Sequence, residues 1–278
     1  MKISTSIGIG ATFPLLLMFG CASSDNAQKL LNPDPPGKMY TSADSYLARG
    51  KFSSAAKKFE ELDRDHPYSP EARRAMVMAA YAYYRAGKYP EAIATAQRYT
   101  TVHPGTKEAA FAHHIIASAY FDEISGPNKD QTKTLKALKQ LQILKSRYPN
   151  SKYARDADNR IRIARDNLAA KEMEVGRYYL KRKKYTGAIN RFKSVVNDYN
   201  DTKHIEEALM RLTECYMALG IKEEAQTAAA VLGHNFPNSP WYKDAYALLQ
   251  SDGLAPRENT GSWISQAWKN IKLPTFNL

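Results

Sequence analysis

The sequence repeats at five positions, and this internal repeat constrains the fold more than any other feature of the chain. When the chain is aligned on five alanines, proline stands twelve residues later in four of the five segments. Eight residues further on, all five segments carry a second alanine. Such self-similarity is typical of chains that stack one structural unit. The first series is Ala55, Ala92, Ala137, Ala188 and Ala225, and the second is Ala75, Ala112, Ala157, Ala208 and Ala245.

Each repeat has the pattern of two helices joined by a tight turn. Glycine at positions 50, 87 and 220 ends the first helix, and the proline stops the second. A serine or threonine two residues after the proline position predicts the N-cap of the next helix in every repeat. These predicted caps are Ser69, Thr106, Ser151, Thr202 and Ser239.

Small residues and tyrosines explain how the two helices of a repeat pack. A small residue three positions before each tyrosine lets the helices approach closely, and the tyrosine fills the space beside them. The pairs are Ala43 with Tyr46, Ala80 with Tyr83, Gly176 with Tyr179 and Thr213 with Tyr216; a shift of eight residues recovers Ala117 with Tyr120 in the third repeat.

The predicted fold is all-α, a right-handed superhelical solenoid of five tetratricopeptide-type helical hairpins. The spacings between anchoring alanines are 37, 45, 51 and 37 residues. The third repeat therefore holds an eight-residue insertion near Gly126, and the fourth has fourteen extra residues. Those fourteen residues predict a first helix that is longer by about 21 Å. We expect repeats 1–3 over 38–150, repeats 4–5 over 151–252, and a tail over 253–278.

The N-terminus has the pattern of an export signal. Lys2 precedes an apolar run that ends at Phe19 and is shorter than the roughly 20 residues of a membrane-spanning helix. Gly20-Cys21 at its end resembles a bacterial lipobox, which implies cleavage after residue 20 and covalent lipid on Cys21. Ala22 in place of aspartate implies export to the outer membrane. Residues 21–37 are then a tether; the alternative is an ordinary signal peptide with a chance cysteine.

Charge and motifs indicate a binding protein rather than an enzyme. The chain carries 40 Lys+Arg against 28 Asp+Glu, a net charge of +12, which favours acidic partners. Export makes nucleic acid an unsuitable partner. The adjacent His113 and His114 cannot both face one metal from a helix, and no HExxH, GxSxG or phosphate loop occurs. We therefore predict no catalysis, no metal, no cofactor besides the lipid, and a packed, inert thiol at Cys215.

In a solenoid of this type the first helices line a concave groove. Aromatic side chains beside arginines suit an extended peptide with aromatic residues and a terminal carboxylate. The alternative is that about half of these residues only pack between repeats. The predicted groove residues are Tyr40, Arg74, Tyr81, Tyr84, Arg85, His114 and Phe121.

Two further segments are candidates for contact with a partner. The run from Lys181 to Lys184 ends the long fourth helix, where cations also interact well with the helix dipole. Five arginines nearby extend it into a predicted basic zone: Arg160, Arg162, Arg165, Arg177 and Arg191. In the tail, Ser262 can cap a short amphipathic helix that suits a membrane interface, a partner groove or the open edge of the last hairpin. Its apolar side comprises Trp263, Ile264, Ala267, Trp268 and Ile271.

These features together resemble the BamD family of lipoproteins in the outer-membrane β-barrel assembly machinery. The most specific stretches are Tyr148-Pro149-Asn150-Ser151, Tyr178-Tyr179 and Asn190-Arg191. Asn200 departs from the repeat proline, and the tail after Gly253 does not match the shorter members. The resemblance covers nearly the whole mature chain to about residue 250.

The resemblance implies a periplasm-facing, lipid-anchored scaffold without enzymatic activity. Its C-terminal repeats would dock a POTRA domain of BamA, with Tyr178, Arg182 and Arg191 at the contact. Its N-terminal repeats would receive the targeting segments of unfolded outer-membrane β-barrel proteins, and further lipoproteins of the machinery are candidate partners. One competing hypothesis is another periplasmic scaffold, coordinating cell wall or division as in the Tol-Pal system. The other is a peptidoglycan-active enzyme, for which no residues remain to build a catalytic domain.

Overall fold

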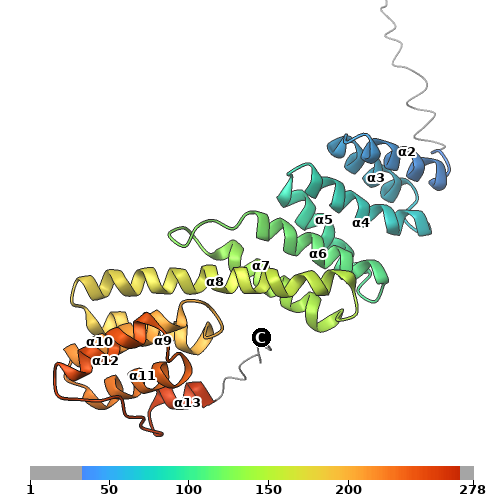
Figure 1. Ribbon diagram of the computed structural model, residues 1–278. Helices are drawn as coiled ribbons and strands as arrows, with labels where there is room; N and C mark the ends of the chain where they lie inside the picture. The colour runs from blue at the N-terminus through green and yellow to red at the C-terminus, as the bar shows by residue number, and fades with distance from the viewer. Residues whose placement is uncertain (1–32, 270–278) are drawn as a thin grey trace, which may run out of the picture.

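The computed structural model describes residues 33–269, which are helical apart from their connecting turns and loops. The predicted signal peptide, Cys21, Ile271 and most of the predicted tether lie outside these residues. Figure 1 shows an elongated stack of helices that follow one another along the molecule. The helices are α2 (Pro36–Ala48), α3 (Phe52–Asp65), α4 (Pro70–Arg85), α5 (Tyr89–Val102), α6 (Lys107–Asp122), α7 (Thr132–Arg147), α8 (Lys152–Lys181), α9 (Tyr185–Asp198), α10 (Ile205–Ala218), α11 (Lys222–Asn235), α12 (Pro240–Gln250) and α13 (Trp263–Lys269).

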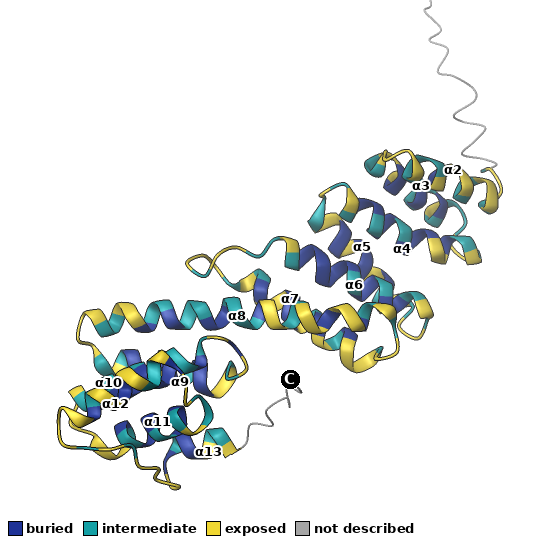
Figure 2. Ribbon diagram, in the orientation of Figure 1, coloured by how far each residue is buried: buried dark blue, intermediate teal, exposed yellow. Residues whose placement is uncertain are grey.

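The prediction of an all-α solenoid of five hairpins is confirmed. The hairpins are α2/α3, α4/α5, α6/α7, α8/α9 and α10/α11. The alanines of both repeat series are buried at the helix contacts, and none is more than 1% exposed. The first helices α2, α4, α6 and α8 contact one another in turn, which places them on one side of the stack. Figure 2 shows the buried residues where neighbouring helices face each other.

Close packing within a hairpin depends on the small residues before the tyrosines. Ala43, Ala80 and Thr213 are fully buried. In α8, a Cβ atom added at Gly176 would lie 2.4 Å from the ring of Phe192, which is itself fully buried. Glycine is therefore required where α8 crosses α9.

The turns follow the predicted chemistry in most repeats. Gly50, Gly87 and Gly220 have φ angles of 71°, 71° and 73° and end their helices. The side chains of Ser69, Ser151 and Ser239 accept hydrogen bonds from the first turn of α4, α8 and α12. Each of these caps satisfies a backbone N–H that the helix itself leaves unpaired.

The cap prediction is confirmed in position for Thr106, although without a side-chain cap hydrogen bond, and is wrong for Thr202. Thr106 stands at the N-cap of α6, yet its hydroxyl donates to the carbonyl of His103 and caps no N–H. Thr202 lies before the helix, since the N-cap of α10 is His204. The Thr202 hydroxyl donates to the carbonyl of Tyr199 and closes the turn that lacks the repeat proline at Asn200. The longer turn delays the start of α10.

The two irregular repeats have the predicted form. Residues 123–131 form the loop between α6 and α7, and α8 is a single helix of 30 residues, against 16 in α4 and α6. At 1.5 Å per residue α8 is about 45 Å long. Its first half packs on α6 and α7 and its second half on α9. One apolar cluster fills α2–α6, with Ala137 of α7, and another fills α8–α13.

The tail packs back on the last hairpins. Residues 254–262 run along α11, where the Gln226 side chain donates to the Ala255 carbonyl and the Thr227 hydroxyl accepts from the Asn259 N–H. The side chain of Ser262 caps α13, whose Ile264 is fully buried against α9 and α11. The open edge of the last hairpin is covered by α12, which contacts α10 and α11, whereas α13 packs on α9 and α11.

Candidate functional site

The inner side of the first helices carries a row of aromatic rings and arginines. At its N-terminal end, Tyr40 of α2 packs edge-on against Phe59, with ring centroids 5.4 Å apart. The guanidinium of Arg74 in α4 lies 5.8 Å from the centre of the Tyr40 ring. Tyr40 is partly exposed and Arg74 is exposed, so both side chains can reach a ligand.

Arg85 is positioned by two aromatic side chains. Its Nη1 donates to the Tyr81 hydroxyl at 2.7 Å, and its guanidinium lies 4.7 Å from the centre of the Phe52 ring. The Arg85 side chain makes no other hydrogen bond to the described residues. Its remaining N–H donors therefore face solvent in a fixed orientation, which suits a carboxylate.

A stack of rings joins α4, α6 and α8. The ring of Phe111 lies 5.5 Å from that of Tyr81 and 5.2 Å from that of Tyr153. The imidazole of His114 stacks on Tyr153 at 4.7 Å. Burial, with the nearby cation of Arg160, lowers the pKa of His114 to about 4, so the imidazole is neutral near pH 7. These rings form a continuous aromatic surface across three hairpins.

The remaining two predicted residues lie at the far end of α4 and α6. The Tyr84 hydroxyl donates to Asp122 at 2.8 Å; burial and this hydrogen bond raise the pKa of Tyr84 to about 12, which keeps it protonated. The guanidinium of Arg160 lies over the ring of Phe121, 5.2 Å from the ring centre. All seven predicted groove residues are thus at least partly exposed and belong to first helices.

Sequence reasoning missed Phe111 and Tyr153, which join the two halves of the row. Phe111 stands one residue before its repeat alanine, the same position that Arg74 occupies in the preceding repeat. That equivalence was the available signal. Tyr153 lies four residues before its repeat alanine, where the other repeats carry Glu71, Glu108, His204 and Trp241, so the repeat gave no common signal for it.

The C-terminal candidates fall into two places. Tyr178 is 52% exposed at the end of α8, and the guanidinium of Arg182 lies over its ring at 4.4 Å. Arg191 projects from α9 and pairs with Glu172 of α8 at 3.1 Å. No contact joins Arg191 to the other two in the described part of the chain. The structure therefore offers one aromatic–cationic contact and a separate ion pair.

The predicted basic zone is wrong for three of its arginines, which have acidic partners inside the molecule. Arg165 binds Asp201 through two nitrogens, and Arg177 pairs with Glu207 at 2.9 Å. Arg191 pairs with Glu172 in the same way. These pairs fasten α8 to α9, to α10 and to the loop between them. Arg160 and Arg162 donate to the neutral side chains of Ser118 and Asn159, so the unbalanced charge of this zone lies on these two arginines and on the exposed run from Lys181 to Lys184.

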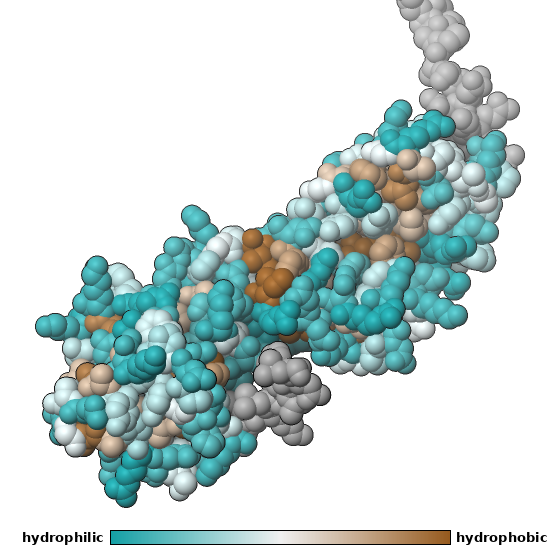
Figure 3. Space-filling model, viewed as in Figure 1, coloured by the Kyte–Doolittle hydropathy of each residue, from teal (hydrophilic) through white to brown (hydrophobic). Residues whose placement is uncertain are grey.

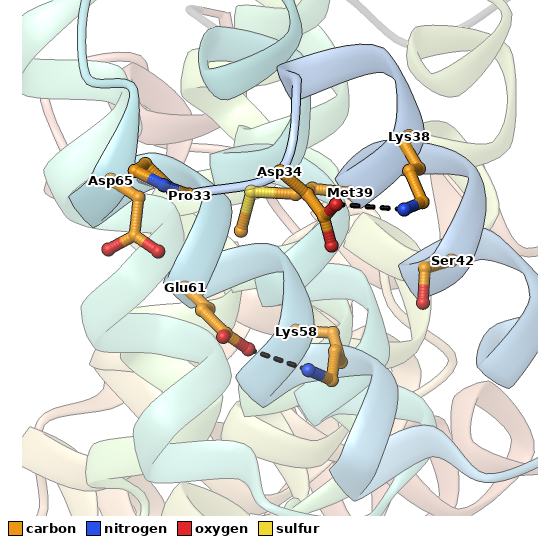
Figure 4. Close-up of a pocket in the computed structure, with 8 residues that line it drawn as sticks. All are labelled: Pro33, Asp34, Lys38, Met39, Ser42, Lys58, Glu61 and Asp65. Atoms are coloured by element: carbon orange, nitrogen blue, oxygen red, sulfur yellow. Dashed lines mark hydrogen bonds and ion pairs between the residues drawn. The ribbon is translucent and has the colours of Figure 1, made fainter. Parts of the chain in front are cut away.

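The described residues hold no cluster of three or more metal-ligating side chains. A cavity of about 140 Å³ lies where the chain enters the first hairpin, beside Pro33 and Met39. Figure 4 shows two ion pairs at this cavity, Lys38 with Asp34 and Lys58 with Glu61; the third carboxylate, Asp65, pairs with Arg64. The Cys215 thiol is buried, which raises its pKa to about 12, as predicted for a packed cysteine.

Comparison with known proteins gives the family. The model of the YfiO family, described as outer membrane lipoprotein, matches residues 33–232, which include both candidate surfaces. The chain belongs to this family. Among the residues described, no helix is both long and apolar enough to cross a membrane.

Curated relatives cover most of this YfiO-family chain. The outer membrane protein assembly factor BamD of Caulobacter vibrioides is 40% identical over 252 residues, which are 90% of this chain and 83% of that protein. The BamD of Rickettsia prowazekii is 36% identical, covering 85% of this chain and 93% of the relative. That of Neisseria gonorrhoeae is 30% identical, with 88% and 95% covered.

Proposed function

We propose that this chain is an outer membrane protein assembly factor, a scaffold that helps β-barrel proteins to fold and insert. The observation that carries this proposal is the 40% identity over 252 residues with the assembly factor BamD of Caulobacter vibrioides. The surfaces described above suit binding, since they present aromatic rings and cations without a nucleophile–base pair. The scaffold acts by holding two partners close together, and it makes and breaks no bond.

The inner aromatic row is proposed to bind the C-terminal targeting segment of an unfolded outer-membrane protein. Rings across α4, α6 and α8 can stack on aromatic side chains of an extended peptide. Arg85, held by Tyr81 and Phe52, can bind a terminal carboxylate with its free donors. The proposed groove residues are Tyr40, Arg74, Tyr81, Tyr84, Arg85, His114 and Phe121.

The fourth repeat is proposed to bind a POTRA domain of BamA. Tyr178 and Arg182 form an exposed aromatic–cationic contact, a combination that is common at the centre of protein interfaces. Arg191 and its partner Glu172 lie on the same repeat. Lipid on Cys21 would hold the scaffold at the outer membrane, facing the periplasm, where no nucleic acid competes.

The first test is purification of the tagged lipoprotein in mild detergent from its own envelope. We expect a POTRA-bearing barrel protein to co-purify, and to be lost when Arg182 is replaced in the variant Arg182→Glu. Recovery of cell-wall or Tol-Pal proteins without a barrel protein would contradict the proposal.

Arg191 can be tested separately, because its intramolecular partner is known. Arg191→Glu removes the pair with Glu172 and should weaken binding to the isolated POTRA domain at least tenfold, about the cost of one charge pair at an interface. The double variant Arg191→Glu/Glu172→Arg restores an ion pair of opposite polarity. If Arg191 touches the partner, the double variant stays weak; restored binding would limit Arg191 to holding α9 on α8.

The inner row is tested with a peptide that ends in an aromatic residue with a free carboxylate. Arg85→Glu should lower its affinity by at least tenfold, since attraction to the carboxylate becomes repulsion. Arg73→Glu is the matched control, because Arg73 is also exposed on α4 and, unlike Arg74 and Arg85, lies over no ring of the row among the described residues. Equal losses in both variants would show a general charge effect and refute the proposed groove.

A further inference from the structure

Helix α7 differs in charge from the second helices of the other four hairpins. The α7 sequence contains five Lys or Arg and no Asp or Glu, whereas α3, α5, α9 and α11 each contain at least one acid. Its buried side is formed by Thr134, Ala137, Leu138, Leu141 and Leu144. The opposite side carries Leu135, Lys136, Lys139, Ile143 and Arg147, which we term the α7 outer face.

The cations of the α7 outer face have no acidic partner among the described residues. The carboxylates at its margins are already engaged, Glu123 with Lys133 and Asp158 with Lys145. Lys136 lies 5.6 Å from the ring centre of Tyr120, and no ion pair engages Lys139 or Arg147. The charge of this face is therefore available to a ligand.

Aliphatic side chains are interleaved with these cations. Leu135 is 52% exposed, and Ile143 is partly exposed between Lys139 and Arg147. A hollow of about 460 Å³ adjoins Leu135 and has Leu168 on its wall; its charged lining is mixed, Lys129 and Lys171 with Asp130 and Glu172. Figure 3 shows apolar side chains gathered near the middle of the molecule, where α7 and α8 lie. Cations alternating with exposed aliphatic groups are typical of surfaces that rest on membranes.

We infer that the α7 outer face binds an anionic phospholipid surface and so sets the angle at which the solenoid lies on its membrane. Membership of an outer membrane lipoprotein family places such a surface next to the chain. A face of unpaired cations without a fixed partner geometry suits mobile phosphate groups better than one folded acidic protein. The inference rests on the membrane attachment in the proposed function and adds a second contact to the anchor.

The test uses the full acylated lipoprotein in vesicles, with a polarity-sensitive dye on the variant Gln142→Cys. Gln142 is exposed on α7, three residues from Lys139, and the Cys215 thiol is buried and does not react. In vesicles of phosphatidylcholine with phosphatidylglycerol the dye should report lipid, and in phosphatidylcholine alone it should report water. High salt should remove the difference between the two vesicle types, because it screens exposed charges.

Charge reversal distinguishes this face from general attraction. Each basic side chain near an anionic surface favours contact by about fivefold. Lys136→Glu/Lys139→Glu removes two of them, so the ratio of lipid-contacting to free α7 should fall by at least about thirtyfold. The control is Lys57→Glu/Lys243→Glu, which changes the net charge equally; Lys57 occupies in α3 the repeat position of Lys139. The control should bind as the unaltered chain does.

Flotation with the vesicles tests the lipid anchor separately from the α7 contact. A chain that floats while its dye reports water in both vesicle types keeps the anchor and refutes the α7 contact. Equal dye signals in both vesicle types, or equal losses in both double variants, also refute it. A chain that does not float contradicts both the anchor and the contact.

Discussion

Lys183 occupies the turn position that glycine fills in three other repeats. Its φ angle is 57°, within the left-handed region where a side chain costs roughly 1 kcal/mol. Lys183→Gly should therefore raise the free energy of unfolding by about 1 kcal/mol, measured by urea denaturation. Gly87→Lys, at the equivalent turn with φ of 71°, should lower it by a similar amount. A destabilised Lys183→Gly variant would mean that the lysine side chain stabilises the turn.

His114 gives the molecule a defined response to acid. Burial lowers its pKa to about 4, below the usual value of about 6.5, so the unfolded chain binds a proton that the folded chain does not. Stability is therefore complete above pH 6.5 and falls with decreasing pH; at pH 5 the loss from His114 is about 2 kcal/mol. Burial shifts the pKa of His113 and His204 in the same direction. His114→Phe should retain the stack on Tyr153. In urea denaturation its free energy of unfolding should fall by about 2 kcal/mol less between pH 7 and pH 5 than that of the unaltered chain.

At the scale of elements, the crossing of α8 and α9 depends on one missing side chain. Gly176→Ala would place a Cβ atom against the buried ring of Phe192 and should cost about 1–3 kcal/mol of stability. Gly187→Ala is the control in α9, since its added Cβ atom would lie 3.4 Å from the Tyr179 ring, an ordinary contact. That variant should be neutral or gain about 0.5 kcal/mol, as alanine favours helix. Thermal melting of both variants checks the prediction, and an equal loss would contradict it.

At the scale of the whole molecule, stability should be local. Phe59 lies in the cluster of the N-terminal hairpins and Phe192 in that of the C-terminal ones, and both are fully buried. Either one changed to Ala should cost about 3–5 kcal/mol. Because a stacked repeat contacts only its neighbours, Phe59→Ala should speed hydrogen exchange in α2–α5 and leave α9–α11 unchanged. Phe192→Ala should do the reverse; uniform acceleration in either variant would show one cooperative core joined through α8.

The sequence by itself determined the five hairpins, the long α8 and the glycine turns, because a spacing that recurs along the chain marks the hairpins and local residues start and stop each helix. It also placed all seven predicted groove residues on accessible sites of the first helices. The tertiary structure alone decided which charges are free: Arg165 meets Asp201 across 36 residues, and Arg177 meets Glu207 across 30. It likewise decided where the tail packs, with Trp263 donating a hydrogen bond to the Tyr216 hydroxyl. Such contacts join different repeats. Their geometry follows from how the hairpins stack, and residue spacing within one repeat does not predict that stacking.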